Sequence, residues 1–173
     1  MRTYSHAILT YRAFRRPGAP TATAAIGTVL PDLPAITGAT WLAANRLERF
    51  SRREFEAEVC GRGVFAGPDA ALHSALPVAL AALASPVCLE RGATRTALLS
   101  FLLGWAGHVA ADVLTHGNDA RPPLWPLSSY RFESPISYRE RDRHALPFTI
   151  AEHAAVLVSA RRATTGTANT YHR

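Results

Sequence analysis

Long stretches rich in alanine and leucine alternate with short proline- and glycine-rich segments along most of the chain. Strands require a period-two alternation of β-branched or aromatic residues with polar ones, and almost no stretch shows it. The pattern therefore predicts an all-α fold. The expected helices cover residues 4–15, 21–29, 36–50, 52–60, 69–89, 91–114 and 148–162. Helix-breaking residues fall where the periodicity lapses, at Pro17-Gly18, Pro31, residues 61–63 and Gly67-Pro68.

The stretch between His116 and Pro147 has no helical period and holds four prolines with several aromatic residues. Loops of this length in a compact domain are usually functional, and the aromatic content predicts a packed, ordered loop. The chain has 173 residues, about the length of one domain. We therefore expect a single helical bundle of about six or seven helices over residues 1–162. Residues 163–173 are expected to form a flexible C-terminal tail.

The composition fits a folded chain, with 48% hydrophobic and 18% charged residues. All 19 basic residues are arginine, against 13 acidic residues, and they are scattered instead of forming a stripe with aromatic side chains. This pattern does not favour a nucleic-acid partner. Attraction to phosphate groups or to an anionic membrane surface stays open. The two cysteines have no metal-type spacing, so neither a disulfide framework nor a zinc finger is predicted.

Residues 70–89 form a run of twenty uncharged residues, about long enough to span a bilayer. The run is mostly alanine and contains His73, Pro77 and Pro86, so its tendency to insert is weak. Integral insertion, a peripheral membrane contact and a buried core helix all stay open. The N-terminal sequence lacks the pattern of a secretory signal peptide. The expected location is therefore the cytoplasm, with or without association with the inner membrane.

The strongest chemical signal is GWAGHVAADVLTH at 104–116, which places His108, Asp112 and His116 at positions i, i+4 and i+8. On a helix these side chains project from nearly one face. A divalent cation bound there would offset the cost of burying the carboxylate. Two plainer interpretations stay open: a hydrogen-bonded His/Asp pair in a helical core, and His116 as a C-terminal helix cap.

Three further segments each add a candidate ligand. Asp69 and His73 form another i, i+4 pair, in which Asp69 is more simply an acid at a helix N-terminus and His73 is the better ligand. Asp32 lies on a turn between Pro31 and Pro34, where it is either a ligand or a helix cap. His6 is a lone histidine in the first helix. Because these apolar segments carry nearly no other charge, their polar residues together suit one or two ions of zinc or a similar divalent metal.

The order of these motifs resembles that of the YdjM-like metal-dependent hydrolase family, whose typical members are inner-membrane proteins and which is distantly related to zinc-dependent phospholipase C. The resemblance rests on His6, GTVLPDLP at 27–34, LHS at 72–74 and GHVAADVLTH at 107–116, and it extends to RPPLWPLSSYRFESPISY at 121–138. It covers about residues 3–138. It implies an all-helical fold with a metal centre held by His6, Asp32, His73, His108 and Asp112.

Two features depart from the family pattern. The hydrophobic helices are weaker than in membrane-bound members, and Arg139 stands where a tryptophan is expected. A later His/Glu pair of the phospholipase type has no clean match, and His144 and Glu152 are its nearest candidates.

The function expected from the sequence is metal-assisted hydrolysis of a phosphoester, such as a phospholipid head group or a nucleotide. Asp32 would be a ligand or the base that orients the water, and Arg121 and Arg131 would bind phosphate oxygens. The sequence contains no GxSxG, P-loop or GxGxxG motif that would indicate another chemistry. The alternative is a non-catalytic, membrane-associated helical protein with a structural metal site or a polar network.

Overall fold

A computed structural model describes residues 1–15, 19–45, 51–61 and 63–168, and over these residues the fold is all-helical, as predicted. Its elements are α1 (Thr3–Ala13), α2 (Thr21–Val29), the 3₁₀ turn η1 (Leu30–Asp32), α3 (Leu33–Asn45), α4 (Arg52–Phe55), the π-turn η2 (Glu56–Gly61), α5 (Ala66–Leu72), α6 (Ala75–Cys88), α7 (Ala93–Thr115), the 3₁₀ turn η3 (Arg141–Arg143) and α8 (Ala145–Ala168).

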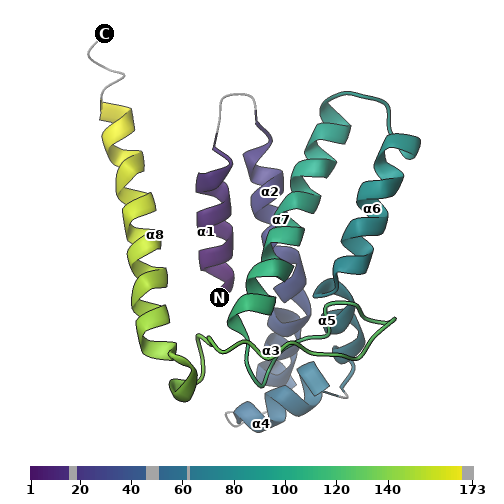
Figure 1. Ribbon diagram of the computed structural model, residues 1–173, viewed down its shortest axis with the longest axis vertical. Helices are drawn as coiled ribbons and strands as arrows, with labels where there is room; N and C mark the ends of the chain where they lie inside the picture. Colours follow the sequence, from purple (N-terminus) through teal and green to yellow (C-terminus); the bar gives the residue numbers. More distant parts are fainter. Residues whose placement is uncertain (16–18, 46–50, 62, 169–173) are drawn as a thin grey trace.

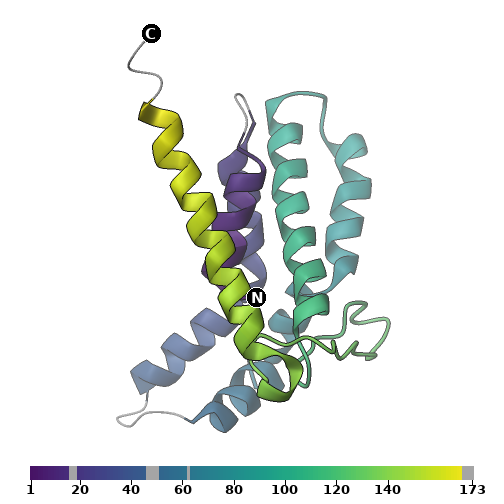
Figure 2. The same cartoon turned by 60° about the vertical axis from the view of Figure 1, so that its left-hand side comes forward.

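Five helices run side by side in the upper part of the molecule, in the order α8, α1, α2, α7 and α6, while α3, α4 and α5 lie below them (Figure 1). Turning the molecule shows the same division, with α8 crossing the bundle obliquely (Figure 2). The core cluster is small and joins α6 to α7 through Val78, Leu102, Trp105 and Val109.

The layer of helices leaves much apolar surface uncovered. The accessible surface is 11242 Å², whereas a compact soluble monomer of this mass exposes only about 8,300 Å². On α6 the outward-facing Leu80, Leu83 and Val87 are all exposed. In this layer of helices several histidine and acidic side chains are buried, whereas apolar side chains on its outer side are exposed.

The prediction for residues 69–89 was wrong in one respect, because the structure contains two helices there instead of one. α5 ends at Leu72, and α6 starts at Ala75 at an angle of 53° to it. Ser74 caps α6 by accepting a hydrogen bond from the N–H of Leu76 at 3.2 Å. The break places His73 outside both helices.

Other boundaries differ less. α3 starts at Leu33, three residues before the expected position, and the second half of the 52–60 helix is a π-turn. The predicted end of α3, 46–50, lies outside the described residues. α8 starts at Ala145 and extends to Ala168, into the segment expected to be a tail. The segment from 117 to 140 contains no regular helix or strand, as expected, but it is not packed throughout, because Tyr130 is 67% and Phe132 40% exposed.

One buried ion pair ties α8 to the start of α1. The side chain of Glu152 is fully buried and accepts a hydrogen bond from the backbone N–H of Arg2 at 2.8 Å and another from its guanidinium. Burial by itself would raise the pKa of Glu152, but the hydrogen bonds from Arg2 outweigh burial and leave that pKa below its ordinary value. The charged form of Glu152 therefore stabilises the fold.

We expect Glu152→Gln to lower the free energy of unfolding by about 2 kcal/mol near neutral pH, because Arg2 keeps partial access to water. Since the folded-state pKa of Glu152 is depressed, the difference from the unchanged protein should be full above the ordinary pKa of a glutamate and should shrink as pH falls through the folded-state value. Chemical unfolding in detergent at several pH values measures it. Glu133→Gln is the control, because Glu133 forms a pair with Arg143 but its side chain is 55% exposed.

Candidate metal centre

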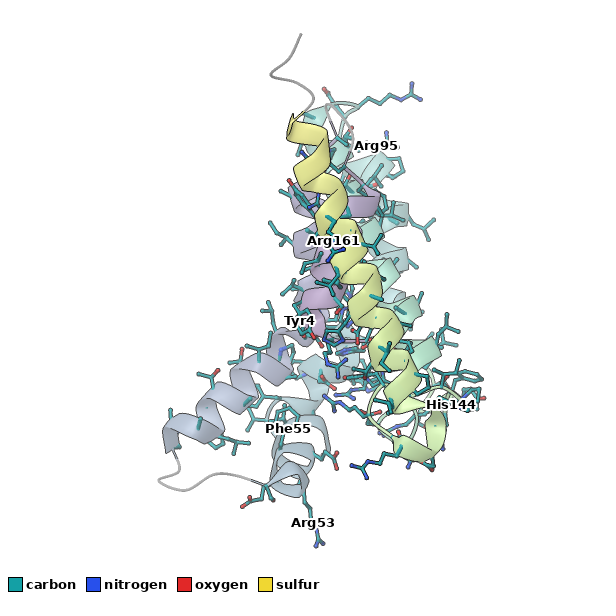
Figure 3. The ribbon with its side chains drawn as sticks, turned by 90° about the vertical axis from the view of Figure 1, so that its left-hand side faces the viewer. Tyr4, Arg53, Phe55, Arg95, His144 and Arg161 are labelled. Atoms are coloured by element: carbon teal, nitrogen blue, oxygen red, sulfur yellow. The ribbon has the colours of Figure 1, made fainter. Side chains whose placement is uncertain are left out.

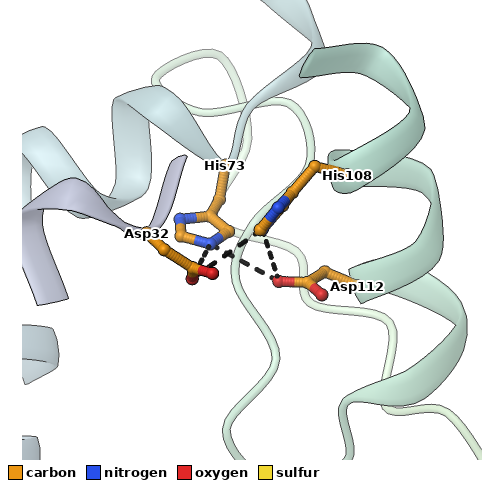
Figure 4. Close-up of side chains that lie close together, drawn as sticks. All are labelled: Asp32, His73, His108 and Asp112. Carbon is orange, nitrogen blue, oxygen red and sulfur yellow. Dashed lines mark hydrogen bonds and ion pairs between the residues drawn. The ribbon is translucent and has the colours of Figure 1, made fainter. Parts of the chain in front are cut away.

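Four side chains from three separate parts of the fold converge in one cluster (Figure 4). Asp32 comes from η1, which directly follows α2, and His73 comes from the break between α5 and α6. His108 and Asp112 lie one turn apart near the C-terminal end of α7. One ligand atom from each residue lies within 4.8 Å of all the others. The tertiary structure thus joins motifs that are up to 80 residues apart in the sequence.

The turn that carries Asp32 is held in place from both sides. Pro31 is fully buried, and the η1 turn leads without a gap into α3. The hydroxyl of Thr3 in α1 donates a hydrogen bond to Asp32 Oδ2. Asp32 Oδ1 then faces the two histidines, 3.9 Å from His73 Nε2 and 3.8 Å from His108 Nε2.

Both histidines are oriented by backbone carbonyl groups. His73 Nδ1 lies 2.8 Å from the carbonyl oxygen of Asp69, and His108 Nδ1 lies 2.6 Å from that of Thr28. A carbonyl only accepts, so each Nδ1 carries the proton and donates. Each Nε2 then faces carboxylate oxygens: His108 Nε2 is 3.1 Å and His73 Nε2 is 3.4 Å from Asp112 Oδ2. Each Nε2 must therefore hold a proton or a cation.

The donor set suits a divalent metal. Two neutral imidazoles and two carboxylates carry a formal charge of −2, which one divalent cation neutralises. Bonds of about 2.0–2.1 Å in a tetrahedral zinc site place neighbouring ligand atoms about 3.3 Å apart. The four N–O distances between the histidines and the aspartates range from 3.1 to 3.9 Å. Histidine ligands usually donate their second ring N–H to a carbonyl or carboxylate, as both do here.

His6 and His116, the other two predicted ligands, lie against Asp112 and outside the group of four. His6 Nε2 is 3.1 Å from Asp112 Oδ1, and the His6 ring stacks on His108 with centroids 4.0 Å apart. Burial lowers the pKa of His6, so its neutral form is favoured. A neutral His6 with its proton on Nε2 donates to Asp112 and fixes that carboxylate.

His116 follows the last helical residue of α7, in agreement with its interpretation as a cap. Its Nδ1 donates to the carbonyl oxygen of Asp112 at 3.0 Å. Its ring packs edge-on against Tyr138, with centroids 5.1 Å apart. Burial lowers the pKa of His116 and raises the pKa of Tyr138 to about 12, so both rings are neutral near pH 7.

None of the four cluster residues lines the cavity of about 690 Å³ on this side of the fold, but its wall includes Asp69, which contacts His73 and Arg121. The wall also includes Arg121, Arg131, Arg139 and Asp119. Arg121 also lines the small recess that contains His73, Asp112 and His116, so it lies between the cavity and the cluster. Both arginines that the sequence predicted to bind phosphate therefore lie in the cavity wall.

The arginines of the cavity differ in how they are held. Arg121 Nε donates to the buried Asp69 at 2.8 Å, and Arg139 pairs with Asp119 at 3.1 Å. Arg131 is exposed and has no hydrogen-bond or ion-pair partner within the described residues. Arg139 also packs over the ring of Tyr138. Arg131 is therefore the side chain best placed to meet an anion from solvent.

Sequence reasoning missed two positioning groups: Thr3, which holds Asp32, and the backbone carbonyl of Thr28, which orients His108. Asp69 was interpreted as an acid at a helix N-terminus, and it does lie in the first turn of α5, where it also links His73 to Arg121. No sequence pattern indicates which backbone carbonyl a histidine will contact. His144 and Glu152 lie outside the cluster: His144 precedes α8, and Glu152 pairs with Arg2.

The helices around the centre include one long enough to cross a membrane. α7 has a mean hydropathy of 1.6 over its most apolar window, and only 28% of that window is buried within the fold. The bent pair α5 and α6 passes the same test when taken together.

Comparison with known proteins identifies the family. Neither the curated proteins nor the solved structures contain a match to this chain. The sequence does match the family described as YdjM inner membrane protein, over residues 3–170. The match includes all four residues of the cluster, and the family description agrees with the lipid-like surface of α6 and α7. Because it covers nearly the whole chain, this protein belongs to the YdjM inner membrane protein family.

Proposed function

We propose that this protein is a metal-dependent hydrolase that cleaves phosphoesters at the inner membrane. One observation carries the proposal: two buried histidines donate through Nδ1 to backbone carbonyls and direct Nε2 at two carboxylates, near an arginine-lined cavity. A folded chain seldom buries such a cluster without a cation, since the paired negative charges destabilise it. The cavity near it supplies room for a substrate.

The residues have distinct roles in this proposal. Asp32, His73, His108 and Asp112 would hold the cation, and the backbone carbonyls behind the histidines keep both rings in the ligating tautomer. A bound divalent cation such as zinc lowers the pKa of a coordinated water toward ~7 and polarises a phosphoryl oxygen. Asp32 is the more accessible carboxylate, with a side chain 19% exposed, so it can also orient the attacking water.

The cavity wall would bind the phosphate. Arg131 has no partner in the part of the chain that the structure describes, so its guanidinium can form two parallel hydrogen bonds to phosphate oxygens. Arg121 is already bound to Asp69, so its role is to keep positive charge between the cavity and His73. A distant relationship to zinc-dependent phospholipase C is part of this proposal, and it rests on the order of the motifs around His6, Asp32, His73 and His108.

A specific observation favours a second candidate, a non-catalytic membrane protein with a structural polar network. Asp112 contacts the ring nitrogens of His6, His73 and His108, so the network holds together by hydrogen bonds alone once the histidines carry the needed protons. A closed site, with every metal position filled by protein, would also be structural. An open position occupied by water distinguishes the hydrolase.

Measurement of hydrolytic turnover distinguishes the hydrolase from the non-catalytic membrane protein. The protein, purified in detergent without a histidine tag, is stripped with a chelator and assayed on a chromogenic phosphodiester and on phospholipid vesicles, before and after addition of zinc or manganese. We expect hydrolysis only with metal. Stoichiometric metal without turnover on any substrate of either class would favour the structural site.

Arg131→Ala is expected to raise KM about tenfold with a smaller effect on kcat, because a lost bidentate phosphate contact is worth about 1.5–3 kcal/mol when partly screened. Initial rates against substrate concentration separate the two constants. Arg141→Ala is the matched control, because Arg141 is an exposed arginine at the start of η3, directly after the loop that carries Arg131, and does not line the cavity. Equal KM changes in both variants would contradict the role of Arg131.

A further inference from the structure

Residues 122–132, which we term the base loop, carry several exposed apolar side chains outside the helices. Leu127 is 80% exposed, Tyr130 67% and Leu124 49%. Both ribbon views place this loop below the lower end of α6 (Figures 1 and 2). Exposed leucines at the tip of a proline-rich loop do not contribute to the core of the protein. Exposed apolar side chains that lie together mark a candidate contact with a membrane or a partner.

The base loop is fixed to the start of α6. The N–H of Ala75, the first residue of α6, donates to the carbonyl of Pro123 at 2.8 Å. The hydroxyl of Ser74 donates to the carbonyl of Trp125, also at 2.8 Å. These hydrogen bonds fix the position of the base loop relative to the first residues of α6. If lipid surrounds that end of α6, the base loop is also in contact with lipid.

α6 has the surface of a helix in lipid. It carries no charged residue from Ala75 to Cys88, and its outer side exposes Leu80, Leu83 and Val87. At 1.5 Å per residue its 14 residues extend about 20 Å, within the ~30 Å of a bilayer's hydrocarbon. The first charged residues after α6 are Glu90, Arg91 and Arg95, which follow its C-terminal end. Arg95 lies near the top of the molecule (Figure 3).

The composition of the base loop fits the boundary between hydrocarbon and water. Trp125 and Tyr130 are the residue types that collect at that boundary, because their rings are apolar and each has one polar atom. Arg131 lies next to the last residue of the loop, and it has no hydrogen-bond or ion-pair partner within the described residues. An arginine at this depth can extend its guanidinium to lipid phosphate groups.

We propose that the base loop lies in the membrane interface on the side of the candidate metal centre, with Leu124 and Leu127 among the upper parts of the acyl chains and Arg131 at the level of the phosphates. The partner is the lipid bilayer. Membership of an inner-membrane family does not specify this surface or its depth. The proposal stands independently of hydrolase activity, but it places the arginine-lined cavity at the level of lipid head groups, where a phospholipid substrate would be found.

Depth-dependent quenching tests the proposal. In a background of Cys60→Ser and Cys88→Ser, single cysteines are introduced as Leu127→Cys, Leu83→Cys and Val64→Cys and labelled with a polarity-sensitive fluorophore. The proteins are reconstituted into vesicles of phosphatidylcholine and phosphatidylglycerol. Val64 is the matched control, because it is an apolar residue with 87% exposure that precedes α5, away from the start of α6.

We expect the probe at 127 to emit at shorter wavelength than the probe at 64 and to be quenched several-fold less by aqueous iodide. A nitroxide near the lipid head group should quench it most, whereas a nitroxide deep in the acyl chains should quench the probe at 83 most. If 83 is protected and 127 is as accessible to iodide as 64, α6 is inserted and the base-loop proposal is wrong. If 83 and 127 are both accessible, the lipid-facing assignment of α6 fails as well.

Discussion

His108→Ala is expected to abolish stoichiometric binding of a divalent metal. Changes to groups that merely support metal ligands lower affinity about 10- to 100-fold, so removal of a ligand should cost more than about 100-fold. His108 is fully buried, and its Nε2 is within 3.8 Å of both carboxylates of the cluster. Elemental analysis of protein purified without a histidine tag, followed by competition titration with a chromogenic chelator, measures the loss.

A matched control separates loss of a ligand from loss of a histidine. His153→Ala removes a histidine from α8 whose Nε2 contacts the hydroxyl of Tyr4, outside the four-residue cluster. This variant should keep the metal content of the unchanged protein. Circular dichroism shows whether each variant remains helical. Full metal content in a folded His108→Ala protein, or no metal in the unchanged protein after reconstitution, would overturn the assignment of the site.

Gly104→Val is expected to destabilise the protein by at least about 3 kcal/mol and to remove the metal site at the same time. A Cβ atom on Gly104 of α7 would collide with the backbone carbonyl oxygen of Ala24 in α2. The contact is reciprocal, since a Cβ on Gly27 of α2 would collide with the carbonyl oxygen of Phe101. Backbone atoms cannot turn aside as a side chain can, so the two helices must separate.

This close approach is the kind of contact that small residues allow between helices in membranes. It also sets the distance between the turn that carries Asp32, at the end of α2, and His108 on α7. Separation of the helices would therefore pull one carboxylate away from the cluster. Thermal unfolding in detergent and metal content should fall together.

Gly107→Ala is the control for the helix itself. Gly107 lies in the same helix, and nothing lies within 4 Å of the position that its Cβ would occupy. Alanine favours helix over glycine by about 0.5–1 kcal/mol, so this variant should unfold at the same or a higher temperature. A Gly104→Val protein with unchanged unfolding temperature and metal content would show that the packing of α2 on α7 does not set the site.

Local patterns were sufficient to predict the helices that end in strong signals. The predicted limits of α2 match Thr21–Val29, because Pro20 precedes that helix and Pro31 follows it. The prediction failed at the junction of α5 and α6, where Ser74 and Pro77 are residue types that favour a helix start, although the pattern around them predicts one long helix. That break depends on Ser74 and Ala75, which bind carbonyl groups of Pro123 and Trp125 about fifty residues away. No local pattern reports such a partner.

The candidate site likewise combines features that local sequence patterns predict with features that only tertiary packing determines. The sequence alone determined that His108 and Asp112 share a helix face, that Asp32 lies on a rigid turn and that His73 accompanies them on another apolar segment, because residue spacing and proline fix local geometry. Only the tertiary structure decided that these four residues meet, while His6 and His116 support Asp112 from outside the group. The physical reason is that the position of the cluster depends on two features. These are the distance between α2 and α7 and the backbone carbonyls to which the histidine rings donate. Both features are set by the packing of helices that are distant in sequence.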